Sequence, residues 1–442
     1  MIADQLISRL RSRWQTINGP LSPRDLWATL WSSLGLGLLL FSYFLVRPIR
    51  EVHGSRLGPA GLSRLFLMTF VALLVITPLW GMLVRVCSKR FLPVALMTVI
   101  AGSLVGFAQL LRNPDSPVWV STSFFVWVSV FNYMMVSLYW SVMVDTFTPE
   151  SGRRTFGIIA AGGSAGAMLG PLAASVLATR MSSSSTLLLA AGLFVVVPVF
   201  LFFVPRLPTT QTATEENASR EEGSIISGLI ETVNTPYLLG IAGYMLIGSL
   251  LGSLLYVHQS GVIQSAIPNE DLRRSFFANT DLAANILTLV FELVVAAPLL
   301  SYGGLRWPLL LLPLIGVLAA PLLTVWPSIY AIAAVLVVRR ATEYGLAKPA
   351  RELLFTVVTQ SQKYKAKNFI DSVVARAGDS IGSSVSHLVV TQKWPPLVAL
   401  WIGVPVSLLF AGIGVWLARE QNKRTTLQSN SAAANSESAK IP

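Results

Sequence analysis

Charged residues interrupt some of the most apolar stretches of this chain, and their types and spacing suit anion binding. In VLVVRRATEYGLAKPARE, the side chains of Arg339, Arg340, Glu343 and Tyr344 occupy about 140° of one helix face at 100° per residue. Guanidinium groups donate paired hydrogen bonds to phosphate or carboxylate oxygens, and a nearby carboxylate holds them in position. This face predicts contact with a solute or coupling ion; the alternative is a salt-bridge network that only tolerates burial.

A second polar stripe follows in the next apolar stretch. Asp371, Arg376 and Asp379 share one side of the expected helix with several serines. Because Arg376 and Asp379 are three residues apart, they could pair within the helix instead of contacting a solute. We count all three as candidate solute-binding residues.

The first apolar stretch ends in FLVRPIREVHG, which contains a third charged group. Arg47, Arg50 and Glu51 share a helix face, and Pro48 is expected to kink the helix beside them. These residues could form an anion clamp. The alternative is that both arginines extend to lipid headgroups and that Glu51 only balances their charge.

Three isolated polar residues are further candidates. Asn132, in NYMMVSLYWSVMVD, could face a polar cavity, although aromatic-rich stripes usually serve packing. Asp145 is expected at a helix end, where it would act in gating. Glu292 is surrounded by apolar residues, so it is either a proton carrier or a partner in an interhelical hydrogen bond.

The composition indicates that lipid is the solvent of this chain. Apolar residues make up 53% of the 442 residues and charged residues only 12%, against roughly 45–50% and about 25% in soluble domains. Hydrocarbon requires every backbone hydrogen bond to be internal, and the apolar stretches are long rather than alternating. We predict an all-α membrane protein with twelve transmembrane helices in two six-helix bundles.

Lysine and arginine are concentrated in alternate loops, which predicts that both termini are cytoplasmic in a bacterial-type inner membrane. No cleaved signal peptide is expected. The two halves are expected to be parallel repeats, because similar basic segments precede the fifth and eleventh spans. The predicted segments are a cytoplasmic N-terminus at 1–25, bundles at 26–204 and 236–418, a cytoplasmic linker at 205–235 and a disordered cytoplasmic tail at 419–442.

Several functions lack the residues that they would need. No Walker A motif occurs, Cys87 is the only cysteine, and the three histidines are scattered. We expect no enzyme activity, no metal site, no cofactor and no nucleic acid polymer as a partner. The expected partners are the lipid bilayer and a small anionic solute, and the expected state is a monomer.

Two sets of residues resemble the major facilitator superfamily. GMLVRVCSKRFL is similar to its loop signature at Gly81, Leu83, Lys89 and Arg90, although Arg85 and Ser88 replace the usual aspartate and glycine. The glycines of FGIIAAGGSAGAMLGP are spaced partly as in proton-coupled drug exporters of the superfamily. Gly162, Gly166 and Gly170 are also spaced for close packing between helices, which suffices to explain them.

Within that superfamily, YFLVRPIREVHG, DTFTPESGRRTFGIIAAGGSAG and the segment around QSQKYKAKNFIDSVVARAGDSIGSS resemble the ATP/ADP translocase family and its bacterial relatives. The resemblance implies phosphate binding by charged residues in the spans. The matching positions are Arg50, Glu51, Lys365, Lys367, Asp371 and Arg376. Lys365 and Lys367 are therefore candidates for coupling or gating, together with Asp145 and Glu292.

The sequence thus predicts a secondary transporter that works by alternating access and moves or exchanges an anionic, phosphorylated or nucleotide-like solute. A proton-coupled exporter of amphipathic compounds is the first alternative, with Glu292 or Asp379 as the proton carrier. A non-transporting membrane scaffold or sensor is the second.

Overall fold

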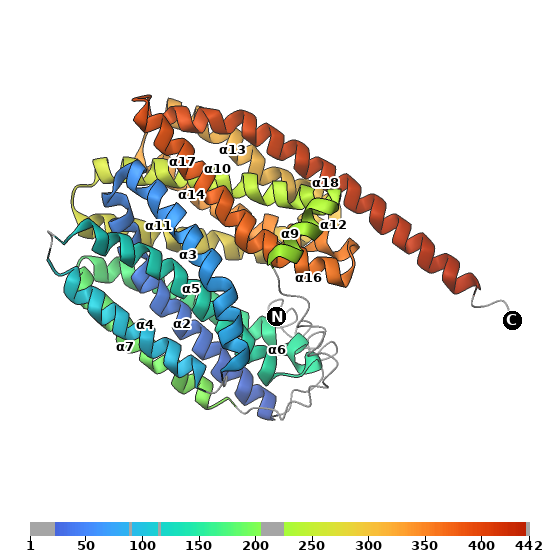
Figure 1. Ribbon diagram of the computed structural model, residues 1–442, viewed down its shortest axis with the longest axis horizontal. Helices are drawn as coiled ribbons and strands as arrows, with labels where there is room; N and C mark the ends of the chain where they lie inside the picture. The colour runs from blue at the N-terminus through green and yellow to red at the C-terminus, as the bar shows by residue number, and fades with distance from the viewer. Residues whose placement is uncertain (1–22, 88–90, 114–115, 205–224, 439–442) are drawn as a thin grey trace, which may run out of the picture. The chain divides into compact units, whose positions relative to one another are not determined.

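The computed structural model describes residues 23–87, 91–113, 116–204 and 225–438, which form helices and contain no strand. The helices before the central connection are α2 (Pro23–Arg56), α3 (Gly58–Val86), α4 (Leu92–Leu110), α5 (Val118–Thr146), α6 (Pro149–Ala178) and α7 (Ser183–Phe202) (Figure 1). The elements after it are α9 (Ile225–Asn234), α10 (Pro236–Ala266), α11 (Glu270–Val290), η1 (Phe291–Val295), α12 (Ala296–Gly303), α13 (Arg306–Val325), α14 (Ile329–Thr342), η2 (Glu343–Ala347), α15 (Lys348–Leu354), η3 (Phe355–Val357), α16 (Gln360–Phe369), η4 (Ile370–Val374), α17 (Ala375–Thr391) and α18 (Leu397–Ser438).

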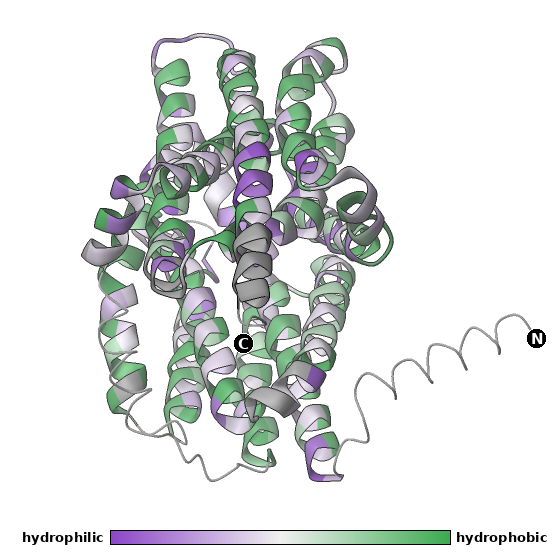
Figure 2. Ribbon diagram, turned by 90° about the vertical axis from the view of Figure 1, so that its right-hand side faces the viewer, coloured by the Kyte–Doolittle hydropathy of each residue, from purple (hydrophilic) through white to green (hydrophobic). Residues whose placement is uncertain are grey.

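The predicted all-α, twelve-helix membrane fold is confirmed. In the described part of the chain, ten helical stretches are long and apolar enough to cross a bilayer, and apolar residues make up most of them (Figure 2). The two remaining spans are the continuous helical stretches Ile329–Leu354 and Gln360–Thr391. They are less apolar because they carry the charged residues of the predicted site.

Side-chain caps explain where several of these helices begin. Ser182, Asn269 and Ser328 each accept a hydrogen bond from the backbone N–H three residues later. Thr359 forms a complete capping box with Gln362 at the start of α16. Such caps satisfy backbone donors that have no partner within the helix.

The chain divides into two compact units. Unit 1 comprises Met1–Ile49, Pro78–Val120 and Trp127–Thr210; unit 2 comprises Arg50–Thr77, Ser121–Val126 and Gln211–Pro442. This division differs from the predicted bundles at 26–204 and 236–418, because two short segments of the first half pack with the second half. Arg50 and Glu51 consequently belong to unit 2, whereas Arg47 belongs to unit 1.

In unit 1, α2 and α6 approach so closely that their backbones touch. A Cβ added at Gly166 would collide with the carbonyl oxygen of Gly37 and lie 2.9 Å from its Cα. At Gly162 it would collide with Ser33. The predicted role of these glycines in close helix packing is therefore confirmed.

We expect Gly166→Ala to lower the free energy of unfolding by about 1–3 kcal/mol, because the new methyl group would force two backbones apart. Gly157 lies in the same helix with no heavy atom within 4 Å of an added Cβ, so Gly157→Ala is the matched control. It should change stability by about 1 kcal/mol or less, in the stabilising direction. Thermal unfolding in detergent measures the stability of both variants. An equal loss of stability in Gly166→Ala and Gly157→Ala would contradict the packing explanation.

Unit 2 contains the same close backbone approach between α10 and α17, which are the first and fifth spans of the second half of the chain. A Cβ at Gly378 would lie 2.9 Å from the Cβ of Ser249, and one at Gly382 would lie 3.0 Å from the carbonyl carbon of Leu250. The glycines are four residues apart in both units, as expected for parallel repeats.

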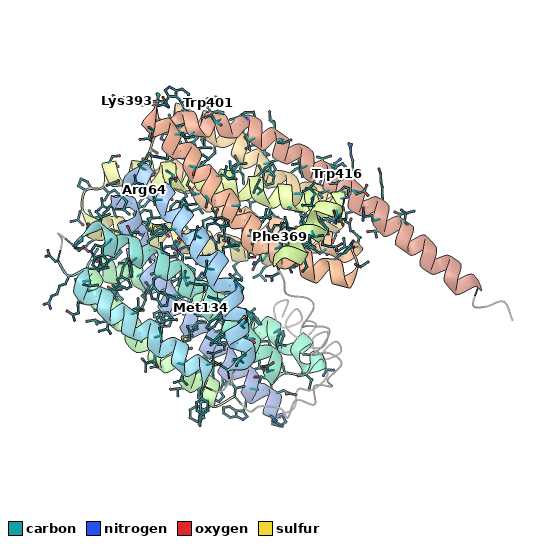
Figure 3. The ribbon with its side chains drawn as sticks, viewed as in Figure 1. Arg64, Met134, Phe369, Lys393, Trp401 and Trp416 are labelled. Carbon is teal, nitrogen blue, oxygen red and sulfur yellow. The ribbon has the colours of Figure 1, made fainter. Side chains whose placement is uncertain are left out.

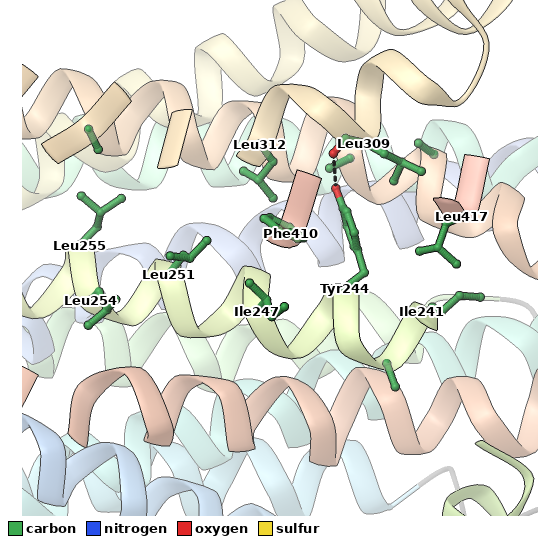
Figure 4. Packing of buried hydrophobic residues seen from close by; sticks show 14 of the residues in the cluster. Ile241, Tyr244, Ile247, Leu251, Leu254, Leu255, Leu309, Leu312, Phe410 and Leu417 are labelled. Atoms are coloured by element: carbon green, nitrogen blue, oxygen red, sulfur yellow. Dashed lines mark hydrogen bonds between the residues drawn. The ribbon is translucent and has the colours of Figure 1, made fainter. Parts of the chain in front are cut away.

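The core of unit 2 forms between α10, α13 and α18. The ring of Tyr244 lies 4.3 Å from that of Phe410, and its hydroxyl donates a 2.9 Å hydrogen bond to the carbonyl of Leu309 (Figure 4). Trp401 lies near the start of α18 (Figure 3). Its indole nitrogen donates to the hydroxyl of Thr324 at 3.2 Å, which ties α18 to α13. These contacts hold α10, α13 and α18 together.

Two segments differ from the sequence-based expectation. The end of the predicted linker at 205–235 forms the helix α9, and residues 205–224 of that linker lie outside the described residues. The predicted disordered tail at 419–442 continues α18 as a helix to Ser438, because its alanine, glutamate, glutamine, lysine and arginine residues favour helix. Residues 1–22 and the motif positions Ser88, Lys89 and Arg90 also lie outside the described residues.

Candidate functional site

Three π-helical turns in unit 2 each contain one of the predicted acidic residues. Glu292 lies in η1, Glu343 begins η2 and Asp371 lies in η4. A π turn inserts an extra residue into the α-helical hydrogen-bond ladder, and such turns are frequent at functional sites. Gly345 of η2 packs against η1, since an added Cβ would lie 2.8 Å from the Cβ of Phe291. The sequence contains no local signal for these turns beyond a carboxylate within an apolar run.

Arg339 is buried and links α14 to α10. Its guanidinium donates a 2.8 Å hydrogen bond to the carbonyl of Gly248 and forms a 3.2 Å ion pair with Glu343. The group lies flat over Gly252, where an added Cβ would be 2.8 Å from the guanidinium carbon. Only glycine leaves this space, so α10 provides a fitted position for the arginine.

Arg340 forms a direct ion pair with Asp281 of α11. The Asp281 side chain is 5% exposed and the Arg340 side chain 18% exposed, so the pair is largely removed from solvent. Asp281 was not among the residues predicted from the sequence. The residue precedes the apolar run of its span, and the tertiary packing of α11 on α14 is needed to pair it with Arg340.

Arg376 and Asp379 of α17 form an ion pair of 3.1 Å. The Arg376 side chain is 47% exposed and that of Asp379 22% exposed, unlike the buried pairs of α14. This arrangement matches the intrahelical alternative stated above. It also leaves Arg376 the most exposed arginine of the predicted set.

Further ion pairs lie where α15, α16 and η4 meet. Arg351 is 3.6 Å from the Asp371 carboxylate and donates to the sulfur of Met245 at 2.9 Å. Lys367 pairs with Glu352 at 2.5 Å. Lys365 belongs to α16, but its side chain lies outside the described residues.

Arg50 and Glu51 pair with each other at 2.5 Å. Glu51 also accepts a hydrogen bond from the hydroxyl of Tyr256 in α10, and the Arg50 guanidinium lies 4.8 Å from the ring centroid of Phe125. Tyr256 was not among the residues predicted from the sequence, because its contact with Glu51 joins two segments that are distant in the chain.

One face of α10 connects these groups. Gly248, Gly252 and Tyr256 are four residues apart and follow one another along the helix. The first two contact Arg339 and the third contacts Glu51. Gly252 and Tyr256 are about 6 Å apart along the axis at 1.5 Å per residue. Unit 2 therefore brings Glu51 and Arg50 to the same helix face as Arg339.

Glu292, Tyr344 and Lys348 are exposed on unit 2. The Lys348 ammonium lies 5.9 Å from the ring centroid of Tyr344 and is close enough to Glu292 and Asp371 to interact electrostatically with both. Lys348 was not among the predicted site residues.

The remaining predicted residues, Arg47, Asn132 and Asp145, belong to unit 1 and are partly exposed there. The Arg47 guanidinium lies 5.6 Å from the ring of Phe44. Among the described residues, no group of three His, Cys, Asp or Glu side chains is arranged to hold a metal ion.

The long apolar helices define the class as a multi-pass helical membrane protein. The family model described as Major Facilitator Superfamily matches residues 141–266, which is less than a third of the chain. No match was found among curated protein sequences.

Solved transporter structures share the fold over nearly the whole chain. The nucleoside transporter NupG has 16% identity and a TM-score of 0.61, with 91% of this chain and 99% of that chain covered. A bacterial homologue of the iron transporter ferroportin, inward-facing, has 14% identity and a TM-score of 0.60, with coverage of 90% and 100%. A bacterial homolog of the human lysosomal transporter Spinster, inward-facing and unoccupied, has 12% identity and a TM-score of 0.59, with coverage of 92% and 98%.

At these identities the similarity establishes the fold. This chain therefore has the Major Facilitator Superfamily fold. The resemblance to the ATP/ADP translocase family is not confirmed by these matches, and nucleotide exchange stays a prediction.

Proposed function

We propose that this protein is a secondary active transporter that binds a small anion bearing phosphate or carboxylate oxygens and moves it by alternating access. A phosphorylated or nucleotide-like metabolite is the proposed solute class. We further propose that it acts as a monomer in a bacterial-type inner membrane, with both termini in the cytoplasm.

The observation that carries the proposal is the exposure of charged groups within the spans of unit 2. Arg376, Glu292 and Lys348 all remain accessible on helices that cross the bilayer. A charge in contact with lipid at mid-span costs at least about 2.5 kcal/mol, so an exposed set of charges indicates a hydrated surface. A hydrated surface within membrane spans is what a solute pathway requires.

The ion pairs of the site fall into two groups with different proposed roles. Arg339 is buried, Arg340 is largely removed from solvent, and both have fixed partners, so they hold α10, α11 and α14 together beside the pathway. Arg376 is exposed, so an anion can replace Asp379 as its partner without first desolvating the guanidinium. We propose that Arg376 makes the first contact with the solute and that Arg50, with Glu51, contributes from the α10 face.

A proton-linked exporter of amphipathic compounds is the second candidate. The observation in its favour is the exposed Glu292 beside the exposed apolar side chains of Leu293 and Val294. Such a surface suits a solute that has both apolar and cationic parts.

Purified protein tested against inorganic phosphate, ATP, a hexose phosphate, a dicarboxylate and a hydrophobic cationic dye distinguishes the two candidates. A ligand at one hundred times its Kd should stabilise the fold by about 2.7 kcal/mol, which raises the midpoint of thermal unfolding. We expect stabilisation by an anion and uptake of that anion into proteoliposomes. Stabilisation by the dye alone, with uptake driven by a pH gradient, would favour the exporter.

A further inference from the structure

The helix α9 has an apolar face that the described residues of unit 2 leave exposed. Leu229, Ile230 and Val233 lie on one side of this ten-residue helix and are 44%, 54% and 56% exposed. Their spacing of one and four residues gives a single stripe. In water such a stripe would be unfavourable on a helix this short, which indicates a partner for it.

The opposite side of α9 is already occupied by α16 (Figure 1). Gly228 and Thr232 are buried on that side, and Gln362 of α16 donates a 2.8 Å hydrogen bond to Glu231. The helix is thus held in a defined orientation, and its apolar stripe is directed away from α16.

The connections of both helices locate them at the membrane boundary. Thr235 alone separates α9 from α10, a membrane span that begins at Pro236. Likewise, α16 continues through η4 into α17 without a break. A helix joined to a span by one residue cannot lie far from the plane in which that span enters the bilayer.

We propose that α9 is an interfacial helix, which inserts Leu229, Ile230 and Val233 between the headgroups and acyl chains of the leaflet where α10 begins. Helices of this kind lie in the membrane plane with the apolar face about 5–10 Å deep. The occupant of the uncovered stripe is therefore lipid. This inference does not depend on the identity of the transported solute.

The composition of α16 gives the interaction a preference for anionic lipid. Besides Lys367, which pairs with Glu352, the sequence QSQKYKAKNF contains Lys363 and Lys365 and no acidic residue. Basic residues next to a membrane surface are attracted to anionic headgroups, by about 1 kcal/mol each. The α9–α16 pair thus combines an apolar stripe with a neighbouring basic segment, which is the composition of membrane-surface elements.

Spin labelling tests the proposal directly, because Cys87 is the only cysteine in the chain. In a Cys87→Ser background, nitroxides are attached at Ile230→Cys and, independently, at Val233→Cys. Val195→Cys, on an exposed position of the span α7, is the lipid reference, and Lys423→Cys in α18 is the aqueous reference. Collision with oxygen and with the water-soluble nickel complex NiEDDA is measured in nanodiscs.

We expect the labels at 230 and 233 to resemble the label at 195, with frequent collisions with oxygen and few with NiEDDA. Frequent collisions with NiEDDA would mean that the stripe faces water, and few collisions with either reagent would mean that protein covers it. Either result overturns the proposal.

The lipid preference is tested with nanodiscs of phosphatidylcholine alone and of an equal mixture with phosphatidylglycerol. The ratio of oxygen to NiEDDA collisions at 230 should rise in the anionic discs. The double variant Lys363→Gln/Lys365→Gln should abolish this rise while it preserves the ratio in phosphatidylcholine. A ratio that does not depend on lipid charge would overturn the assignment to anionic lipid.

Discussion

Arg340→Met is expected to lower the free energy of unfolding by about 3–5 kcal/mol, the cost of removing one partner from a buried ion pair. Its partner Asp281 is 5% exposed and lies on a neighbouring helix, so the substitution leaves a carboxylate that water cannot readily reach. Unfolding by titration with sodium dodecyl sulfate, or thermal unfolding in detergent, measures the loss.

The double variant Arg340→Met/Asp281→Leu tests whether the loss of stability comes from breaking the ion pair or from the loss of the arginine side chain itself. Removing both charges should restore most of the stability, because an apolar pair of similar volume can match or exceed a buried ion pair. Arg306→Ala is the matched control, since Arg306 is exposed and its guanidinium lies over the ring of Trp307. It should change stability by about 0.5 kcal/mol or less. If the double variant is as unstable as Arg340→Met, the broken ion pair between Arg340 and Asp281 does not explain the loss of stability.

The same double variant tests whether Arg340 has a second role in transport. Under the proposed function it should fold and yet transport more slowly, because an arginine near the pathway is lost. Full transport by the stable double variant would assign Arg340 to structure alone and remove it from the solute site.

The fold was predictable because lipid imposes a constraint that the composition reveals. Long apolar stretches can satisfy their backbone hydrogen bonds only as helices, so the count of spans and the all-α class followed from the sequence. The close contact at Gly166 was also predictable, since glycines four residues apart in a membrane helix permit backbone contact.

The partners of the charged residues were not predictable, because they come from other helices. Helical periodicity assigned Arg339 and Arg340 to one face, but Gly252 and Asp281 became their partners only through tertiary packing. The π turns shift each following residue by about 100° relative to a regular helix, which changes the face that a simple count assigns. Helical periodicity therefore predicted which helix face carries these arginines, but not the residues that they contact.

The helix α9 was not predicted from the sequence, for a different reason. The surrounding segment is polar and acidic, so a composition average over 205–235 indicated a linker. The stripe of Leu229, Ile230 and Val233 occupies only its last turns and is too short to dominate such an average. A short amphipathic helix is stabilised mainly by what it packs against, in this case α16, and that information is not local.

Arg376→Gln is expected to weaken binding of the transported anion by roughly 10- to 100-fold, which corresponds to the loss of a hydrogen bond to a charged group of about 1.5–3 kcal/mol. The Arg376–Asp379 pair is half-exposed, so the same change should cost at most about 1 kcal/mol of stability. The measurement is the Kd for the anion identified in the solute screen, together with thermal unfolding. Arg376→Lys should recover part of the affinity, because it restores the charge but not the paired donors.

Asp379→Asn distinguishes two roles of Arg376: contact with the transported anion, or neutralisation of Asp379. The two roles predict different effects of this variant. If the anion replaces Asp379 at the guanidinium, neutralising the carboxylate removes a competitor, and affinity should stay the same or rise. If Arg376 serves only to neutralise Asp379, both single variants should lose transport, and the double variant should be no worse than either. Loss of anion affinity in Asp379→Asn would therefore exclude Arg376 as the first contact for the solute and leave the pair as a structural element of α17.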